Sequence, residues 1–446
     1  MPASDPATPV TLDIKDRIAV VTIDSPPVNA LGHGVRSGVM AALDRAEADG
    51  AVDAVVIRGG GRCFSGGADI REFGTPPAEP VLRQLCARIE EFPKIAVAAL
   101  HSTAFGGGLE LPLSCHYRVA DASAQIALPE VKLGIVPGSG GTQRLPRIIG
   151  AKRALKVILS GDPFSAQEAR DLGVLDAIVD GDLTDAAVAY AARLVAEGAP
   201  LRKVRDLAVA DADAEVFAEA RKTWEKRSRG LLAPLACIDC VEIAATKPFD
   251  EGMEREREIF VACRDSEQSK AQRHLFFAER EAAKVKDVPR DTQKRPINTA
   301  AVVGCGTMGG GIAMCLANVG IPVTVLETTE DALAAGMAKI EKNYAATVSK
   351  GRLSQDAMNT RMGLISGTTN YADLGPADIV IEAVFEEMEL KKTIFGELDK
   401  VMKPGAVLAT NTSTLDIDEI AAATKRPQDV IGTHFFSPAN VMKLME

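Results

Sequence analysis

The chain has 446 residues, 46% of them hydrophobic and 25% charged, a balance typical of globular proteins and a length that suggests about three domains. Its 51 basic and 61 acidic residues give a net charge of −10, which argues against nucleic-acid binding because no global positive field attracts phosphates. Apolar stretches stay below the ~18 residues of a membrane span and no signal peptide is evident, so we expect neither.

Two glycine-rich turns each follow an apolar strand in the first part of the chain. The turn at Ser65 to Asp69 follows a strand expected at Val52 to Arg58, and Gly106 to Gly108 follows one expected at Ile95 to Leu100. The second turn opens a helix expected over Leu109 to Cys115, where free N–H groups and partial positive charge favour an anion. Two backbone donors directed at one oxygen would form an oxyanion hole.

Two glutamates accompany these turns. Glu110 lies just inside the expected helix, and Glu130 follows in Leu128-Pro129-Glu130. Together they can add one proton to a substrate and remove another, which is the chemistry of adding water across a conjugated double bond. The structural alternative is an ordinary tight turn beside two solvated surface acids.

Five segments in register resemble the crotonase, or enoyl-CoA hydratase/isomerase, family. The resemblance spans residues 1–195, and the segments are Pro27 to Leu31, Phe64 to Ile70, Gly106 to Glu110, Leu128 to Val131 and Gly138 to Arg144. One departure is Pro112, which removes a helical N–H and is expected to adjust the position of Glu110 without abolishing activity.

This resemblance implies a role for each matching position. The N–H groups of Ala68 and Gly107 form the oxyanion hole for a thioester carbonyl. One of Glu110 and Glu130 activates water for attack at C3, and the other protonates C2. The positions that bind coenzyme A, with Arg62 expected at a phosphate, are Asn29, Ala30, Arg62, Gly66, Ala68 and Asp69. Two glutamates favour a hydratase, and an enzyme that mainly isomerises 3-enoyl-CoA to 2-enoyl-CoA remains the alternative.

The middle of the chain carries no chemical motif. Helices are expected around residues 231–245, which include Cys237 and Cys240, and over Ser269 to Val285, an amphipathic stretch that ends before Pro289. The two cysteines lack the second pair that a zinc site needs, so we assign them to the core as free thiols and expect no metal.

A nucleotide-binding pattern follows the middle segment. A strand expected at Ala300 to Val303 runs into a Gly-x-Gly-x-x-Gly turn, then a helix at Gly310 to Val319 and a strand at Val323 to Leu326. The turn glycines allow close approach of a pyrophosphate, and an acid at the end of the second strand binds ribose hydroxyls, with no following arginine to favour NADP. The cofactor is therefore expected to be NAD, bound by Gly304, Gly306, Thr307, Met308, Gly309 and Glu327.

The remaining residues resemble the 3-hydroxyacyl-CoA dehydrogenase family. The matching segments are Ile381 to Glu386, Asn411 to Thr414 and His434 to Pro438. The resemblance makes His434 the base that takes the hydroxyl proton, with Glu446 as the carboxylate that orients it. It places Ser413 at the substrate oxygen, and Ala383, Glu386 and Lys391 near the cofactor.

These observations predict an α/β protein of fatty-acid β-oxidation. We expect a crotonase-type ββα spiral domain over residues 1–195, a helical extension and linker over 196–294, and a doubly wound Rossmann-type NAD-binding domain over 295–446. The helical domain that follows in the dehydrogenase family is absent, so we expect NAD binding to survive while oxidation of 3-hydroxyacyl-CoA is impaired.

Partners and location follow from the same resemblance. Acyl-CoA thioesters are the expected substrates, and the oligomeric state stays open. The expected location is the cytoplasm of a bacterium, or the peroxisome if the protein is eukaryotic and longer. A non-catalytic protein that binds acyl-CoA and NAD is the alternative of another class.

Overall fold

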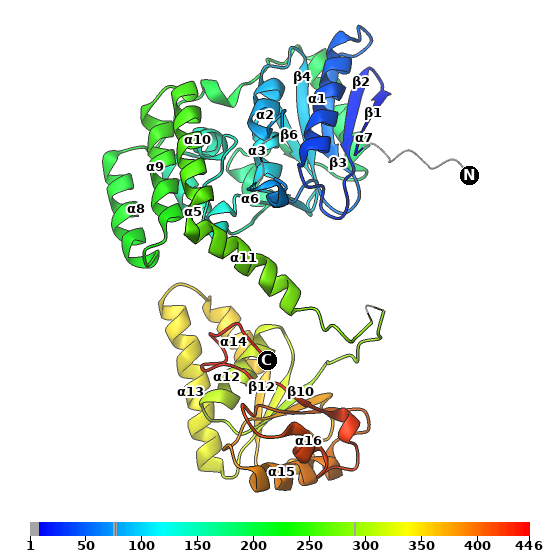
Figure 1. Cartoon of the computed structure of the whole chain (residues 1–446), viewed down its shortest axis with the longest axis vertical. Coiled ribbons are helices and arrows are strands. Elements are labelled where there is room, and N and C mark those ends of the chain that lie inside the picture. The colour runs from blue at the N-terminus through cyan, green and yellow to red at the C-terminus, as the bar shows by residue number, and fades with distance from the viewer. Residues whose placement is uncertain (1–8, 75, 77, 290) are drawn as a thin grey trace, which may run out of the picture. The chain divides into compact units, whose positions relative to one another are not determined.

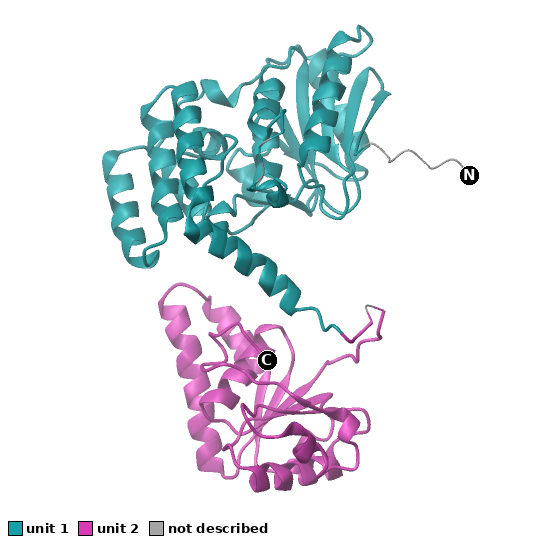
Figure 2. Cartoon of the chain, in the orientation of Figure 1, with its two compact units in different colours: residues 1–286 teal, residues 287–446 magenta. Residues whose placement is uncertain are grey.

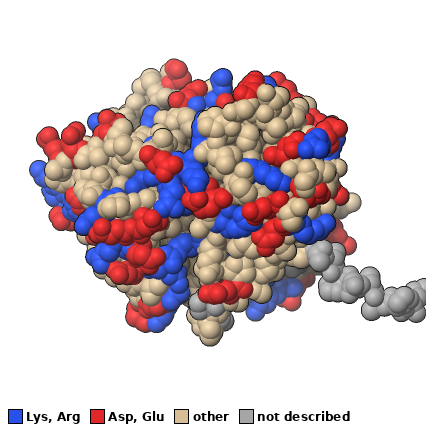
Figure 3. All heavy atoms as spheres, turned by 90° about the horizontal axis from the view of Figure 1, so that it is seen from above, with Lys and Arg blue, Asp and Glu red and all other residues tan. Residues whose placement is uncertain are grey.

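The computed structural model describes residues 9–74, 76, 78–289 and 291–446 and divides into two compact units, residues 1–286 and 287–446 (Figure 1, Figure 2). Residues 1–8, which contributed to the expectation of no signal peptide, lie outside the described residues. Within the described ranges, no helix is both long and apolar enough to cross a membrane. On the face shown in Figure 3, basic and acidic side chains are interspersed.

The first unit is built on a six-stranded sheet with the order β1-β2-β3-β4-β6-β9, in which only β1 and β2 pair antiparallel. Its strands are β1 (Val10–Lys15), β2 (Ile18–Ile23), β3 (Ala54–Gly59), β4 (Ile95–Leu100), β6 (Tyr117–Ala120) and β9 (Ala177–Ile178). A smaller sheet contains β5 (Thr103–Phe105), β7 (Gln125–Ala127) and β8 (Phe164–Ser165).

Both faces of the larger sheet are covered, which explains why its central strands are almost continuously apolar. Val55 and Ile57 of β3 join the core cluster that includes α1 (His33–Ala48), whereas Ala54 and Val56 join the cluster formed with α7 (Leu183–Ala196). The strand ends and their turns are thereby fixed on a rigid support.

Helices complete the first unit. They are α2 (Leu82–Glu90), α3 (Gly107–Leu113), α4 (Gly141–Ile149), α5 (Ala151–Ser160), α6 (Ala166–Asp171), α8 (Ala214–Arg227), α9 (Leu232–Thr246), α10 (Phe249–Asp265) and α11 (Glu267–Ala282), with the 3₁₀ turns η1 (Ile70–Glu72), η2 (Glu130–Leu133) and η3 (Val204–Asp206). In α9, Cys237 and Cys240 are free and buried, as predicted. Trp224 of α8, the only tryptophan in the sequence, packs half-buried against the same core.

The segment expected as an extension from residue 196 is not separate from the preceding domain. Helix α9 packs against α4, α5 and α10, and its Ile238 and Val241 are completely buried in the main core cluster. This burial of apolar surface joins the helices to the first unit up to residue 286, and the rest of the expected linker falls in the second unit.

The second unit has a six-stranded, fully parallel sheet with the order β12-β11-β10-β13-β14-β15, which is 3-2-1-4-5-6 along the chain and confirms the doubly wound nucleotide-binding architecture. Its strands are β10 (Ala300–Val303), β11 (Val323–Leu326), β12 (Ile365–Thr368), β13 (Ile379–Glu382), β14 (Val407–Thr410) and β15 (Val430–Gly432). Its helices are α12 (Thr307–Asn318), α13 (Glu330–Ser349), α14 (Gln355–Gly363), α15 (Met388–Val401) and α16 (Ile417–Ala421), with η4 (Tyr371–Leu374) and η5 (Pro427–Asp429).

Helix α12 begins at Thr307, three residues before the predicted start at Gly310. Its glycines explain the difference. A Cβ on Gly309 would lie 1.9 Å from the carbonyl oxygen of Gly304, so the first turn of the helix approaches the preceding strand end as closely as backbone allows.

Candidate active site

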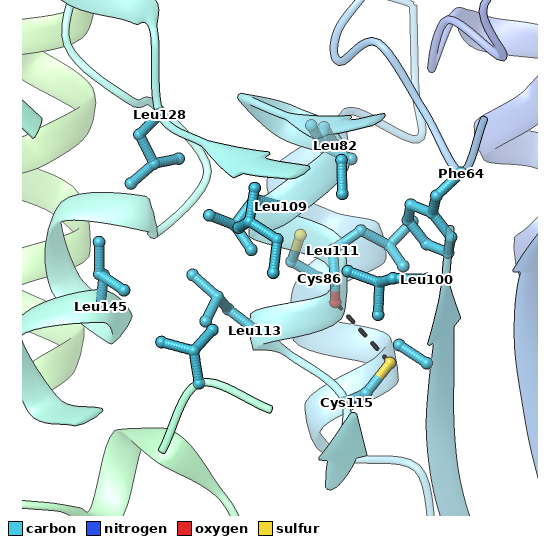
Figure 4. Packing of buried hydrophobic residues seen from close by; sticks show 14 of the residues in the cluster. Phe64, Leu82, Cys86, Leu100, Leu109, Leu111, Leu113, Cys115, Leu128 and Leu145 are labelled. Carbon is cyan, nitrogen blue, oxygen red and sulfur yellow. Dashed lines mark hydrogen bonds between the residues drawn. The ribbon is translucent and has the colours of Figure 1, made fainter. Parts of the chain in front are cut away.

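Helix α3 places Glu110 in its first turn, but it begins at Gly107, two residues before the predicted start, and ends at Leu113. Pro112 lies inside this helix, which ends one residue later. In Figure 4, the leucines of α3 lie among apolar side chains from the surrounding elements; they are Leu109, Leu111 and Leu113, packed near Leu82, Leu100, Leu128 and Leu145. This packing fixes the helix that carries Glu110.

The carboxylate of Glu110 is held at the N-terminus of α4. Its Oε1 accepts hydrogen bonds from the N–H groups of Ser139, at 2.7 Å, and Gly141, at 2.9 Å. The side chain is only 3% exposed. Burial raises the pKa of Glu110, and the two N–H groups oppose that rise because they stabilise the charged form.

Glu130 has a contrasting environment at the start of η2. Its Oε2 is buried and has no hydrogen-bond partner among the described residues. Burial, followed by the charge of Glu110, raises the pKa of Glu130 well above its ordinary value. Gly106, at φ +55°, stands against this side chain, and a Cβ there would lie 2.7 Å from Glu130 Oε1. The neutral acid is therefore the favoured form of Glu130.

The predicted oxyanion donors lie side by side. A Cβ on Gly107 would be 3.0 Å from the Ala68 nitrogen, and neither N–H donates a hydrogen bond to any acceptor in the described ranges. Ala68, Gly107, Glu110 and Glu130 all line one pocket of about 360 Å³. The structure thus brings together the four residues predicted to perform the chemistry in the first unit.

The predicted coenzyme A positions divide between the pocket and its support. Gly66, Ala68 and Asp69 line the pocket, whereas Ala30 and the exposed Arg62 do not. Asn29 is buried, and its side-chain amide donates to the carbonyl oxygens of Cys63, at 2.7 Å, and Gly60, at 2.9 Å, so it holds the segment that leads into the glycine-rich turn. Arginines that the sequence did not indicate line the pocket instead, namely Arg36, Arg83, Arg257 and Arg264.

A further buried glutamate close to Glu110 was missed by the sequence interpretation. Glu256 of α10 is fully buried and accepts hydrogen bonds from the N–H groups of Gly140, at 2.7 Å, and Thr142, at 3.2 Å, and from the Thr142 hydroxyl. Burial and the charge of Glu110 raise the pKa of Glu256 to about 8. Its helical spacing could have indicated this role. Glu256 shares one face of α10 with the buried residues Phe249, Gly252, Met253 and Cys263, and an acid on the buried face of a helix needs hydrogen-bond donors.

In the second unit, the glycine-rich turn between β10 and α12 meets Glu327 at the end of β11. The Cys305 N–H donates to Glu327 Oε1 at 2.6 Å, and Gly304 takes a φ of +95°. A Cβ on Gly306 would meet nothing within 4 Å, so the turn leaves open space at the start of α12. Thr307 is the first residue of α12, and Met308 packs against the hydrophobic core of the second unit. An open turn at a helix N-terminus, beside a carboxylate, fits a dinucleotide.

The predicted residues for alcohol oxidation form two groups. In one, His434 Nδ1 is 3.0 Å from Glu446 Oε2. In the other, Glu386 Oε1 accepts the Ser413 N–H at 2.8 Å, and Lys391 Nζ lies 3.3 Å from Glu386 Oε2. Burial opposes ionisation, but hydrogen bonds from Thr412 and Ser413 and the charge of Lys391 prevail and lower the pKa of Glu386 to about 2. Ala383, at the end of β13, is half-buried.

One hydrogen bond links the loops that carry these groups. The Phe435 N–H, next to His434, donates to the side chain of Asn411 at 2.8 Å, and Asn411 directly follows β14. Lys391 is also fixed by its buried pair with Glu382, at 2.8 Å. The residues expected around the cofactor are thus held at the carboxyl ends of β13, β14 and β15.

Comparison with known proteins identifies both units. Residues 13–228 match the family described as enoyl-CoA hydratase/isomerase, and residues 299–446 match the NAD binding domain of 3-hydroxyacyl-CoA dehydrogenase. The chain is 43% identical to a peroxisomal bifunctional enzyme of Danio rerio, over 97% of this chain and 60% of that protein. The Homo sapiens enzyme of the same name is 40% identical, over 97% and 61%. A peroxisomal fatty acid beta-oxidation multifunctional protein of Arabidopsis thaliana is 36% identical, over 97% and 62%.

These curated relatives are longer than this chain, which spans 60% to 62% of their length. The matches cover both units in the same order as they occur here.

Proposed function

We propose that this chain, whose units match an enoyl-CoA hydratase/isomerase and the NAD binding domain of a 3-hydroxyacyl-CoA dehydrogenase, hydrates 2-enoyl-CoA to 3-hydroxyacyl-CoA in its first unit. The observation that supports this function best is one pocket lined by two buried carboxyl groups and two backbone N–H groups without acceptors in the described residues. Hydration needs a base, an acid and an oxyanion hole, and all three are available there.

The environments of the two glutamates suggest different roles. Glu110 is the base that removes a proton from water as the oxygen attacks C3, because two N–H groups orient its carboxylate and stabilise its charge. Glu130 is the acid that delivers a proton to C2, because its buried carboxyl favours the neutral form. The N–H groups of Ala68 and Gly107 hold the thioester oxygen as negative charge develops on it.

A single assay tests this function. The purified chain is mixed with crotonyl-CoA and NAD, and loss of the conjugated thioester absorbance is followed together with formation of NADH. Loss of absorbance supports the hydratase, and NADH in addition supports oxidation by the second unit. Binding of both compounds with no change in either signal would favour the non-catalytic alternative and overturn the proposal.

The isomerase alternative gives a further prediction. Glu110→Gln is expected to lower hydration by about 10²- to 10⁴-fold if Glu110 activates water. Isomerisation of 3-enoyl-CoA should fall less, because a double-bond shift can proceed with one acid. Both rates are measured on the same preparation, with the exposed Glu197→Gln as the control. A hydration rate equal to that of the control would refute the assigned base.

For the second unit, we propose NAD-dependent oxidation of the 3-hydroxyacyl-CoA that the first unit forms. When bound, NAD supplies the acceptor for a hydride. His434 takes the hydroxyl proton at Nε2, because its Nδ1 faces Glu446, and the carboxylate fixes the ring orientation. Glu327 and the open turn at Gly306 would hold the adenosine half of the cofactor.

Removal of the ribose-binding carboxylate tests the cofactor site. Glu327→Ala is expected to raise the Kd for NADH by roughly 10- to 100-fold, the value of a hydrogen bond to a charged group, and to free the Cys305 N–H. Titration of NADH fluorescence measures this change, and Glu341→Ala, an exposed position on α13, is the control. A Kd within twofold of the unmodified chain would place the ribose elsewhere.

We also propose a reducing compartment for this protein. The sequence has eight cysteines, and all eight are free in the structure, although seven are buried. This supports the cytoplasm of a bacterium or a peroxisome, the compartment that the names of several relatives give for those proteins.

A further inference from the structure

Two buried glutamate side chains share the N-terminus of α4. The backbone N–H groups of four consecutive residues point to them, in the order Ser139, Gly140, Gly141 and Thr142. The first and third donate to Glu110, at 2.7 and 2.9 Å, and the second and fourth donate to Glu256, at 2.7 and 3.2 Å. The turn is therefore held between one carboxylate from α3 and one from α10.

The backbone conformation of this turn allows successive N–H groups to point to Glu110 and Glu256 in alternation. Gly140 takes a φ of +103°, and a Cβ there would lie 2.0 Å from Arg144 Nη1, so the position requires glycine. The Thr142 hydroxyl adds a further hydrogen bond to Glu256, and Gln143 Nε2 donates to that hydroxyl at 3.1 Å. The hydrogen bonds that Glu256 accepts thus all come from residues of this turn.

Glu256 does not line the pocket, so its contact with the site is through this turn, while its charge also contributes to the raised pKa of Glu130. If its acceptors were lost, the N–H groups of Gly140 and Thr142 would be buried without partners, and the turn would rearrange to satisfy them. Any such movement also displaces the two donors that orient Glu110. A displacement of about 1 Å in a catalytic group costs about 10²-fold in rate.

We propose that Glu256 is a positioning residue of the hydratase, which fixes the turn at residues 139–142 so that the Glu110 carboxylate stays directed at the attacking water. The inference rests on the hydratase function proposed above. Glu256 lies beyond residues 13–228, the part that matches the hydratase family, so α10 supports a site whose catalytic groups all lie within that part.

The first test compares two glutamates of α10. Glu256→Gln keeps the size of the side chain but loses one acceptor oxygen, and it is expected to lower kcat for crotonyl-CoA hydration by about 10²-fold with KM within twofold. Glu258→Gln, an exposed position paired with Arg255, is the matched control and should leave both constants unchanged. A Glu256→Gln enzyme with unchanged kcat, or with a rise in KM alone, would overturn the proposal.

A second pair of variants keeps the test decisive if Glu256→Gln does not fold. Thr142→Val removes the hydroxyl that donates to Glu256 and accepts from Gln143, and it is expected to lower kcat by about tenfold. Thr142→Ser retains both hydrogen bonds and should stay near the unmodified rate. Equal rates for the two variants would refute the positioning role. An unmodified chain that lacks hydration would instead refute the proposed function, and the two failures are therefore distinguishable.

Discussion

Replacement of Glu130 by glutamine is expected to lower the hydratase kcat by about 10²- to 10⁴-fold, because the amide cannot deliver a proton to C2. KM should change little, since Glu130 Oε2 makes no hydrogen bond within the described residues. In the unmodified enzyme, burial and the charge of Glu110 raise the pKa of Glu130 and favour the protonated acid, so activity should fall as pH rises through that pKa.

The same variant separates catalysis from stability. A neutral amide avoids the cost of ionising a buried carboxyl, so the unfolding midpoint of the first unit in Glu130→Gln at pH 8 should not fall below that of the same unit in the unmodified chain. Steady-state kinetics from pH 6 to pH 9 and a thermal melt measure both effects. A kcat within threefold of the unmodified value would remove Glu130 from the mechanism.

The second large effect is expected from Gly107→Ala. The added Cβ would lie 2.6 Å from Leu82 Cδ2 and 3.0 Å from the Ala68 nitrogen, so it occupies the space where both oxyanion donors converge. Loss of an oxyanion donor costs about 10²- to 10³-fold in kcat. Single-turnover hydration of crotonyl-CoA measures this loss directly.

The matched control is Gly50→Ala in the same unit, where an added Cβ would meet nothing within 4 Å. It should keep the unmodified rate. Gly107→Ala with a normal kcat, in a protein whose melting curve is also normal, would mean that the thioester oxygen binds away from Ala68 and Gly107.

The chemistry of the first site could be predicted from the sequence because it depends on local features. Glycine runs after apolar strands determine where backbone N–H groups are exposed, Glu110 lies two residues after one such run, and Glu130 lies in a short motif of its own, Leu128-Pro129-Glu130. The structure accordingly places Glu110, Glu130 and the N–H groups of Ala68 and Gly107 in one pocket.

What the sequence could not provide depends on packing between distant segments. Glu256 reaches the turn from 116 positions away, and a glutamate within a charged amphipathic helix is ordinarily solvated. Arg62 was expected at a phosphate from the family resemblance; it is exposed and does not line the pocket, whereas Arg257 of α10, which the sequence did not indicate, does. Local sequence patterns do not indicate which face of a distant helix will line a pocket.

For the second unit, the order of strands, turn and acid predicted the fold, because right-handed crossovers leave few arrangements for a strand–helix alternation. The predicted start of α12 was wrong by three residues. Helix propensity disfavours glycine, but Gly309 allows the first turn of α12 to pack directly against Gly304. The buried pair of Lys391 and Glu382 was not predicted, because its partners come together only when β13 and α15 pack.

The two units have separate hydrophobic cores, and this affects how an unfolding experiment on the chain is interpreted. Each core cluster lies wholly within one unit, so the chain is not expected to unfold in one all-or-none step, and a single melting temperature would average two equilibria. Trp224 packs only against the first core, so intrinsic tryptophan fluorescence reports on the hydratase unit alone. A transition seen by circular dichroism and silent in that fluorescence therefore belongs to the nucleotide-binding unit.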